Sequence, residues 1–181
     1  MKFTDEQRLI VYMLSGVQRA LKVQSEVDPE FIQRVAVAGD EWAILEKYPW
    51  LDQDGSSAPD FVVETRHILQ AFRIIYRSLE NLSDADRERA QSGSSRHVLT
   101  FDGFDGNNES DHYSAAALIT QEAGRWPEFA ALAVNSHHPT LHRYRAILEA
   151  VSDHQSANPG GLLSADQLIE VAGRARRAQL D

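Results

Sequence analysis

The chain has 181 residues, 43% of them hydrophobic and 25% charged, which are the proportions of an ordinary globular protein. This composition excludes collagen-like, wholly disordered and disulfide-scaffold proteins, and the length favours a single domain over residues 1–181. The 18 basic and 27 acidic residues give a net charge of −9, which disfavours nonspecific binding to a phosphate backbone.

The sequence indicates a bacterial-type protein of the cytoplasm. It has no cysteine, which excludes disulfide bonds and thiolate nucleophiles. Its start lacks the pattern of a signal peptide. The longest apolar run, residues 129–134, is far shorter than the roughly 18 residues of a membrane span, so we expect no membrane contact.

Apolar residues recur every three to four positions from the start of the chain, the period of an amphipathic helix. Thr4 and Gln7 have the spacing of a capping box for a first helix. Asp28 followed by Pro29 predicts the start of a second helix, and Gly39 predicts its end. The apolar stripe of the first helix comprises Leu9, Ile10, Met13, Leu14, Val17, Ala20 and Leu21.

The central part of the chain contains the longest periodic segment, from Phe61 to Leu79, which predicts a central helix packed in the core or against a partner helix. A shorter helix over residues 42–48 precedes it and is stopped by Pro49. Ser83 is expected to cap a short charged helix that follows. Segments 49–58 and 91–96 are rich in Gly, Ser and Asp or Gln, which predicts flexible loops.

The C-terminal half is also expected to be helical. Residues 98–101 are the only plausible extended segment, and a turn follows in which Gly103 and Gly106 supply positive φ angles. Helices are expected over residues 109–123, over 127–135 and from Pro139, and a capping box at Ser164 should start the last one. The sequence therefore predicts a compact all-α bundle of roughly seven to nine helices without significant sheet.

Two histidines four residues apart, His138 and His142, have the spacing of metal ligands on one helix face, with a third ligand from Asp111 or His112. The alternative is that they are capping and surface histidines. The acidic turn at 102–111 suggests calcium, but neither register of the EF-hand pattern fits it. We therefore keep a metal site only as a weak alternative.

The sequence contains none of the GxxxxGK, GxSxG or GxGxxG motifs, and we expect no cofactor. An enzyme would have to gather a base, an acid and a binding group in one cleft. Trp126 is expected either to fill the core or to form a ligand platform with Arg125. The candidate residues for such a site, including the binding candidates, are Asp102, Asp105, Arg125, Trp126, His138 and His142.

A second alternative is a nucleic-acid or regulatory binder that uses its arginines. The acidic balance argues against it, so nucleic acid is an improbable partner. The tail arginines have a simpler interpretation, because cations near a helix C-terminus stabilise the helix dipole. The arginines concerned are Arg143, Arg145, Arg174, Arg176 and Arg177.

Five segments follow one another along nearly the whole chain: TDEQRLI from Thr4, LTFDGFD from Leu99, EAGRW at 122–126, HPTLHRYRAIL at 138–148 and LSADQLI from Leu163. Together with Tyr113, they resemble the YfbU family of bacterial proteins. The resemblance implies a compact, all-helical, cytoplasmic domain that associates with itself. It carries no catalytic residue over to this sequence.

These observations favour a non-enzymatic helical interaction or regulatory protein that forms a homo-oligomer. The reason is that several apolar stripes occur in a chain of modest length, while no catalytic constellation is visible. The alternatives are a small metal- or ligand-dependent enzyme and the nucleic-acid binder.

Overall fold

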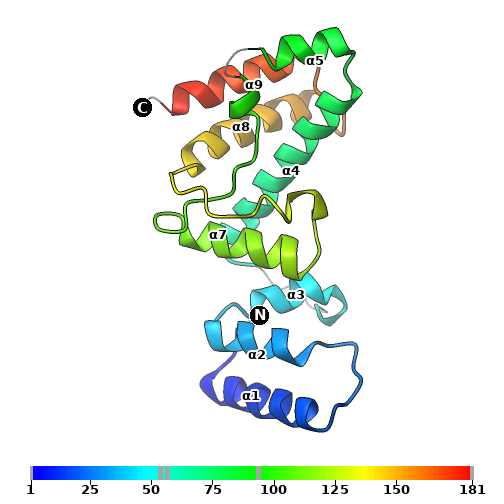
Figure 1. The fold of residues 1–181 in the computed structure, drawn as a ribbon, viewed down its shortest axis with the longest axis vertical. Helices are drawn as coiled ribbons and strands as arrows, with labels where there is room; N and C mark the ends of the chain where they lie inside the picture. Colours follow the sequence, from blue (N-terminus) through cyan, green and yellow to red (C-terminus); the bar gives the residue numbers. More distant parts are fainter. Residues whose placement is uncertain (1, 53–54, 56–57, 93–94, 180–181) are drawn as a thin grey trace.

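The computed structural model describes residues 2–52, 55, 58–92 and 95–179, except for the side chains of residues 95 and 96. The molecule is elongated (Figure 1). A hairpin of α1 (Asp5–Ala20) and α2 (Pro29–Ala38) forms one end, and α5 (Asp84–Ala90) and α9 (Ala165–Ala178) lie at the other. Regular structure within the described ranges is helical, apart from one isolated bridge between Phe104 and Asn135. The all-α prediction is confirmed.

The helix starts in the N-terminal part follow the local sequence. The Thr4 hydroxyl accepts a hydrogen bond from the Gln7 backbone N–H, and the Gln7 side chain accepts one from the Thr4 N–H, so the predicted capping box is present. Asp28 caps α2 by accepting from two backbone N–H groups. Gly39 ends α2 with a φ of 82°, a left-handed conformation that glycine adopts without steric cost.

The next elements are α3 (Trp42–Lys47), the 3₁₀ turn η1 (Pro49–Leu51) and α4 (Asp60–Asn81). The prediction of a flexible loop at 49–58 includes residues 53, 54, 56 and 57, which lie outside the described residues. The apolar face of α4 is buried within the protein, so the core rather than a partner helix receives it. Its fully buried side chains include Val62, Ile68, Leu69, Phe72 and Ile75.

The segment after α4 differs in part from the prediction. Ser83 caps α5 as expected, because its hydroxyl accepts from the Asp86 N–H. Residues 93 and 94 of the second predicted loop lie outside the described residues. The extended segment predicted at 98–101 is wrong at its start, since Val98 ends the short helix α6 (Ser95–Val98). Both Val98 and Leu99 are buried in the core, which favours the helical turn over an edge strand without a partner.

The helix predicted over 109–123 is present as α7 (Ser110–Ala117) and a π-helical continuation, η2 (Leu118–Glu122). Gly124 follows with a φ of 68°. The side chains that the fold buries are His112, Ala115, Ala116, Ile119 and Thr120.

The helix predicted over 127–135 is wrong in length, since only η3 (Pro127–Phe129) is a regular helical turn. The reason is that residues 135 and 136 pair with the loop before α7, where the Ser136 N–H donates to the Phe104 carbonyl at 3.1 Å. The last two helices are α8 (Leu141–Ala157) and α9, which pack along each other. The predicted capping box of α9 is present at Ser164 and Gln167.

The core contains a cluster of aromatic rings between α4, the loop at 99–104 and α8. The ring of Phe72 lies edge-on to Tyr144 with centroids 4.9 Å apart, and Phe101 stacks on Tyr144 at 5.4 Å. Phe104 and Phe129 complete the cluster, and all five rings are fully buried. Edge-to-face and offset contacts of this kind add to the free energy gained from burial.

The hydroxyl of Tyr144 fixes the loop at 102–106 to α8. It donates to the Gly103 carbonyl at 2.9 Å and accepts from the Asp102 N–H at 2.8 Å. Burial raises the pKa of Tyr144 to about 12, so the hydroxyl keeps its proton.

Two glycines let this loop approach the segment at 132–135. Gly103 has a φ of 82°, and a Cβ at this position would lie 2.0 Å from the Val134 carbonyl oxygen. The prediction of a positive φ is wrong for Gly106. There the glycine is needed for space, because a Cβ would meet the Asn135 side-chain amide at 2.8 Å.

We predict that Tyr144→Phe destabilises the protein by about 1–3 kcal/mol, since it removes the acceptor of the partly buried Asp102 N–H and one of the two hydroxyl donors to the buried Gly103 carbonyl. The free energy of unfolding, measured by urea denaturation, checks this. Tyr12→Phe is the matched control, because Tyr12 is 52% exposed on α1. Equal stability of the two variants would contradict the role given to the Tyr144 hydroxyl.

Candidate functional site

The most unusual surface of the protein is the apolar side of α1. The stripe predicted from the sequence is present on this helix, but it faces solvent instead of the core. Six side chains on it, each 53–69% exposed, form what we call the outer face of α1: Leu9, Ile10, Met13, Leu14, Val17 and Leu21.

The opposite side of α1 packs against α2, and apart from Val11 its residues are small or polar. Ser15 is the one residue of α1 that the fold buries completely, and Val11 and Gln18 are half-buried. Arg8 on the same side forms a 2.8 Å ion pair with the buried carboxylate of Glu41 before α3. Amphipathic helices at protein surfaces normally turn their apolar side inward. Helix α1 does the reverse.

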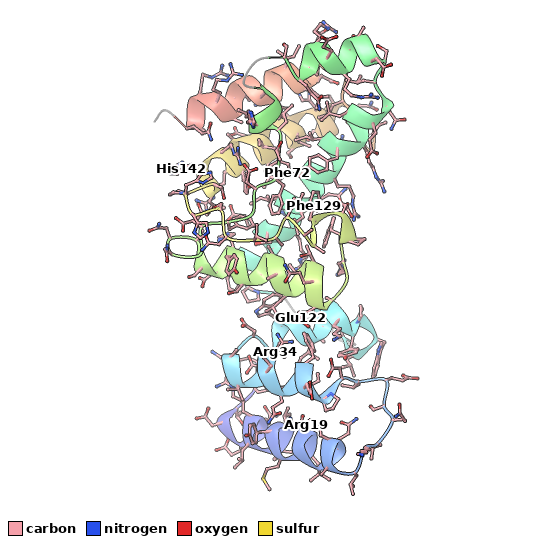
Figure 2. The ribbon with its side chains drawn as sticks, viewed as in Figure 1. Arg19, Arg34, Phe72, Glu122, Phe129 and His142 are labelled. Carbon is pink, nitrogen blue, oxygen red and sulfur yellow. The ribbon has the colours of Figure 1, made fainter. Side chains whose placement is uncertain are left out.

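The hairpin is held to the rest of the molecule through α2. Phe31 and Val35 of α2 lie in the common core. Arg34 and Glu122, labelled in Figure 2 on facing elements, form a 2.9 Å ion pair between α2 and η2. These contacts fix α2 and leave α1 as the outermost helix at this end (Figure 1).

The residues predicted for a ligand or metal site fall into two groups. Asp102, Asp105 and His138 lie at the junction where the loop at 102–106 meets the start of α8, and the exposed His142 on the first turn of α8 is labelled in Figure 2. Asp102 pairs with the buried Arg143 at 2.5 Å. The ring of His138 contacts the Ser136 carbonyl at 2.7 Å.

Asp105 organises its own turn. Its carboxylate accepts from the Asn107 N–H at 2.9 Å and from the Asn108 amide at 2.6 Å. These two hydrogen bonds hold the pKa of Asp105 below its usual value. The carboxylate thus closes a turn within residues 105–108.

Arg125 and Trp126 lie at the other end of α7, away from this junction. The helical segments α7 and η2, 8 and 5 residues long, separate the two groups by roughly 20 Å, at about 1.5 Å per residue. Arg125 forms a 2.9 Å ion pair with the buried carboxylate of Glu46 on α3. The six predicted residues therefore do not share one cleft.

Trp126 combines both arrangements expected for it. The indole is half-buried and packs against the core. The guanidinium groups of Arg73 and Arg125 lie 5.4 and 5.1 Å from the ring centroid, within cation–π range. Arg73 also forms an ion pair with Glu128, and Arg125 forms one with Glu46. Both cations beside the indole are therefore already paired with carboxylates.

Glu109 is not among the residues predicted for a site, yet its carboxylate organises the junction. One of its oxygens accepts from the backbone N–H groups of Thr140 and Leu141, at 2.8 and 2.7 Å. The other accepts from the Asp105 N–H and the Thr140 hydroxyl, both at 3.0 Å. Glu109 thus caps α8 from 31 residues away, which explains why α8 starts at Leu141 instead of Pro139.

A second carboxylate, Glu64 on α4, joins two helices. It pairs with Arg145 of α8 at 2.7 Å and with His112 of α7 at 2.8 Å. The hydrogen bonds from Arg145 and then from His112 outweigh the effect of burial and lower the pKa of Glu64 to about 2. No group of three metal-ligating side chains is found in the part of the chain that the structure describes.

The arginines predicted for nucleic-acid binding are dispersed. Arg143 is buried, and Arg145 is paired with Glu64. Arg174 pairs with Asp153 and Glu170, while Arg176 and Arg177 lie in the last turn of α9. That position matches the helix-dipole interpretation.

A cavity of about 480 Å³ lies beside α5. Tyr76, Leu99 and Arg87 contribute to its wall. The Arg87 guanidinium donates to the carbonyls of Leu79, Glu80 and Leu82 at the end of α4. It therefore acts as a helix C-cap.

The family model of the YfbU domain matches residues 1–172 of the chain. The chain belongs to the YfbU family. No curated protein and no solved structure matched it. The match includes α1 and most of α9, so the exposed stripe of this YfbU chain is part of the family domain. Within the described ranges, none of its helices is long and apolar enough to cross a membrane.

We predict that the ion pairs of Glu64 stabilise this YfbU protein above pH 4.5 by about 1–2 kcal/mol, with allowance for solvent screening at the partly exposed Arg145. Because the folded-state pKa is lowered from 4.5 to about 2, the contribution is lost as the pH falls through that window. Urea unfolding of the parent and of Glu64→Gln at pH 7, 4 and 2.5 checks this. The difference in unfolding free energy between the two proteins should decrease as the pH falls.

The control is Glu149→Gln, at an exposed position on α8. Its stability difference from the parent should be small and nearly constant with pH. A gap for Glu64→Gln that widens on acidification would contradict the assignment.

Proposed function

We propose that the 181 residues form one helical domain that acts in the cytoplasm as a non-enzymatic interaction or regulatory module and self-associates. The observation that carries the proposal is the outer face of α1. It is a continuous apolar surface on a helix that contacts the rest of the protein through its other side.

The outer face is large enough for a specific interface. Its six side chains, 53–69% exposed, present roughly 80–120 Å² each, on the order of 600 Å² together, which is most of the ~800 Å² that each partner contributes to a standard interface. Patches of several hundred Å² on soluble proteins usually mark interaction sites. At about 25 cal/mol per Å², covering this face is favourable by more than 10 kcal/mol before the costs of association.

The placement of the polar side chains favours an interaction module over an enzyme. The residues considered for a cleft are divided between the two ends of α7. The buried carboxylates of Glu46 and Glu109 are bonded to arginines or to backbone N–H groups. Such groups hold the fold together, whereas a general base needs access to a substrate proton.

We predict that the parent chain sediments as a dimer or higher oligomer at micromolar concentration, above the 20.3 kDa of one chain. Met13→Glu should raise the dissociation constant about 100-fold or more, because association would bury carboxylates without partners. Analytical ultracentrifugation over a concentration series measures both. Met13 is 61% exposed, so the variant should keep its helical circular dichroism.

The matched control is Leu162→Glu, which adds the same charge at a 47% exposed apolar residue before α9. It should leave the dissociation constant within about twofold. Weak dimers are detectable at protein concentrations of about 100 μM. If the parent chain is still monomeric at that concentration, self-association is disproved.

A further inference from the structure

The two ends of α1 carry opposite charge. Asp5 and Glu6 occupy its first turn, Arg19 its last turn, and Lys22 follows directly after its C-cap. Among the described residues, Glu6, Arg19 and Lys22 form no ion pair with the rest of the chain. The helix dipole adds a partial positive charge at the start of α1 and a partial negative charge at its end.

Glu6 lies on the same side of α1 as the apolar stripe. It precedes Leu9 and Ile10 by three and four positions, the spacing of neighbours on one helix face. At the other end, Lys22 follows Leu21, the last residue of the outer face, and is exposed with a φ of 51°. The outer face is therefore an apolar stripe with an acidic end and a basic end.

We propose that two copies of this chain pair through antiparallel α1 helices, related by a two-fold axis that passes near Met13 and Leu14. This arrangement rests on the proposed self-association and specifies its partner and geometry. The occupant is a second copy because the stripe complements itself. Rotation about its centre brings Ile10 opposite Val17 of the other copy and places Glu6 opposite Leu21, next to the other copy's Lys22.

A parallel pair lacks this complementarity. It would place Glu6 against Glu6 and Lys22 against Lys22, and like charges that face each other are destabilising. It would also align the two helix dipoles side by side in the same direction. A two-fold pair uses the same patch on both copies and closes, so it does not propagate into fibres.

The position of α1 leaves this approach open. It is the outermost helix at its end of the molecule, and the hairpin projects from the other helices (Figure 1). A second hairpin can meet the outer face without contact between α1 and the core helices of the partner. The six apolar residues extend over more than three turns of α1, so a paired helix would be covered along most of its length.

Cysteine cross-linking tests the orientation, and the absence of native cysteine makes the result clean. We would make Ile10→Cys and Val17→Cys separately in the full chain and oxidise each alone and as an equal mixture. A disulfide requires Cα atoms within about 7 Å. The antiparallel pair predicts a rapid 10–17 cross-link in the mixture and slow cross-linking of each variant alone.

A parallel pair predicts the reverse, with rapid cross-linking of each variant by itself. That result would overturn the antiparallel arrangement and leave self-association standing. A chain that dimerises but forms none of these disulfides above the level of Leu162→Cys would overturn α1 as the interface. A monomeric parent chain would overturn the proposed function itself.

Charge exchange gives a second readout. In the antiparallel pair, Glu6→Lys converts two attractive contacts into repulsive ones and should raise the dissociation constant roughly 3–30-fold at low salt. The double variant Glu6→Lys, Lys22→Glu should return it to near the parent value. Failure of the double variant to recover, with an unchanged circular dichroism spectrum, would count against the proposed register.

Discussion

Only a few elements can pack against the apolar side of α4. The arrangement of the other helices depends on which elements do so. Helices α7 and α8 and the loop at 99–104 cover it, and the rings of Phe72, Phe101 and Tyr144 fill the space between them. Helix α2 reaches the same core through Phe31 and Val35. Among the described helices, α2 is the one with which α1 makes extensive contact, and the apolar stripe of α1 is left exposed. The exposed stripe is thus a consequence of how the core is filled.

The contacts on the side of α1 that faces α2 explain why the helix does not rotate about its axis to bury its apolar stripe. Ser15 packs closely against α2, and Arg8 reaches the buried Glu41. Rotating α1 by half a turn would leave that carboxylate buried without its ion pair, which is costly. The hairpin therefore has a stable orientation in which the apolar side points outward. A second copy that covers this side would supply the burial that the single chain does not provide.

The polar groups of the interior have a different role. Glu109, Arg143 and Glu64 each connect segments that are far apart in the sequence. Glu109 caps α8 while it also holds the turn at Asp105, and Arg143 ties α8 to the carbonyls of His97 and Thr100. These bonds replace the hydration that the buried charges lose on folding. Asp102, Asp105 and His138, which the sequence offered as binding candidates, lie at this junction and are hydrogen-bonded within it.

Local signals determined much of this protein without any tertiary information. The capping boxes at Thr4 and Ser164, the stop at Gly39 and the period of the stripes each depend on residues within a few positions, so the helices and the all-α class could be predicted. The tertiary structure alone decided which stripes become core. The repeat of apolar residues looks the same in the sequence whether the helix packs on α4 of its own chain or on a helix of another chain, because the hydrophobic effect has no preferred direction. It also decided the cap from Glu109, the π-helical end of α7 and the separation of Arg125 from Asp105, since each depends on contacts between residues distant in the chain.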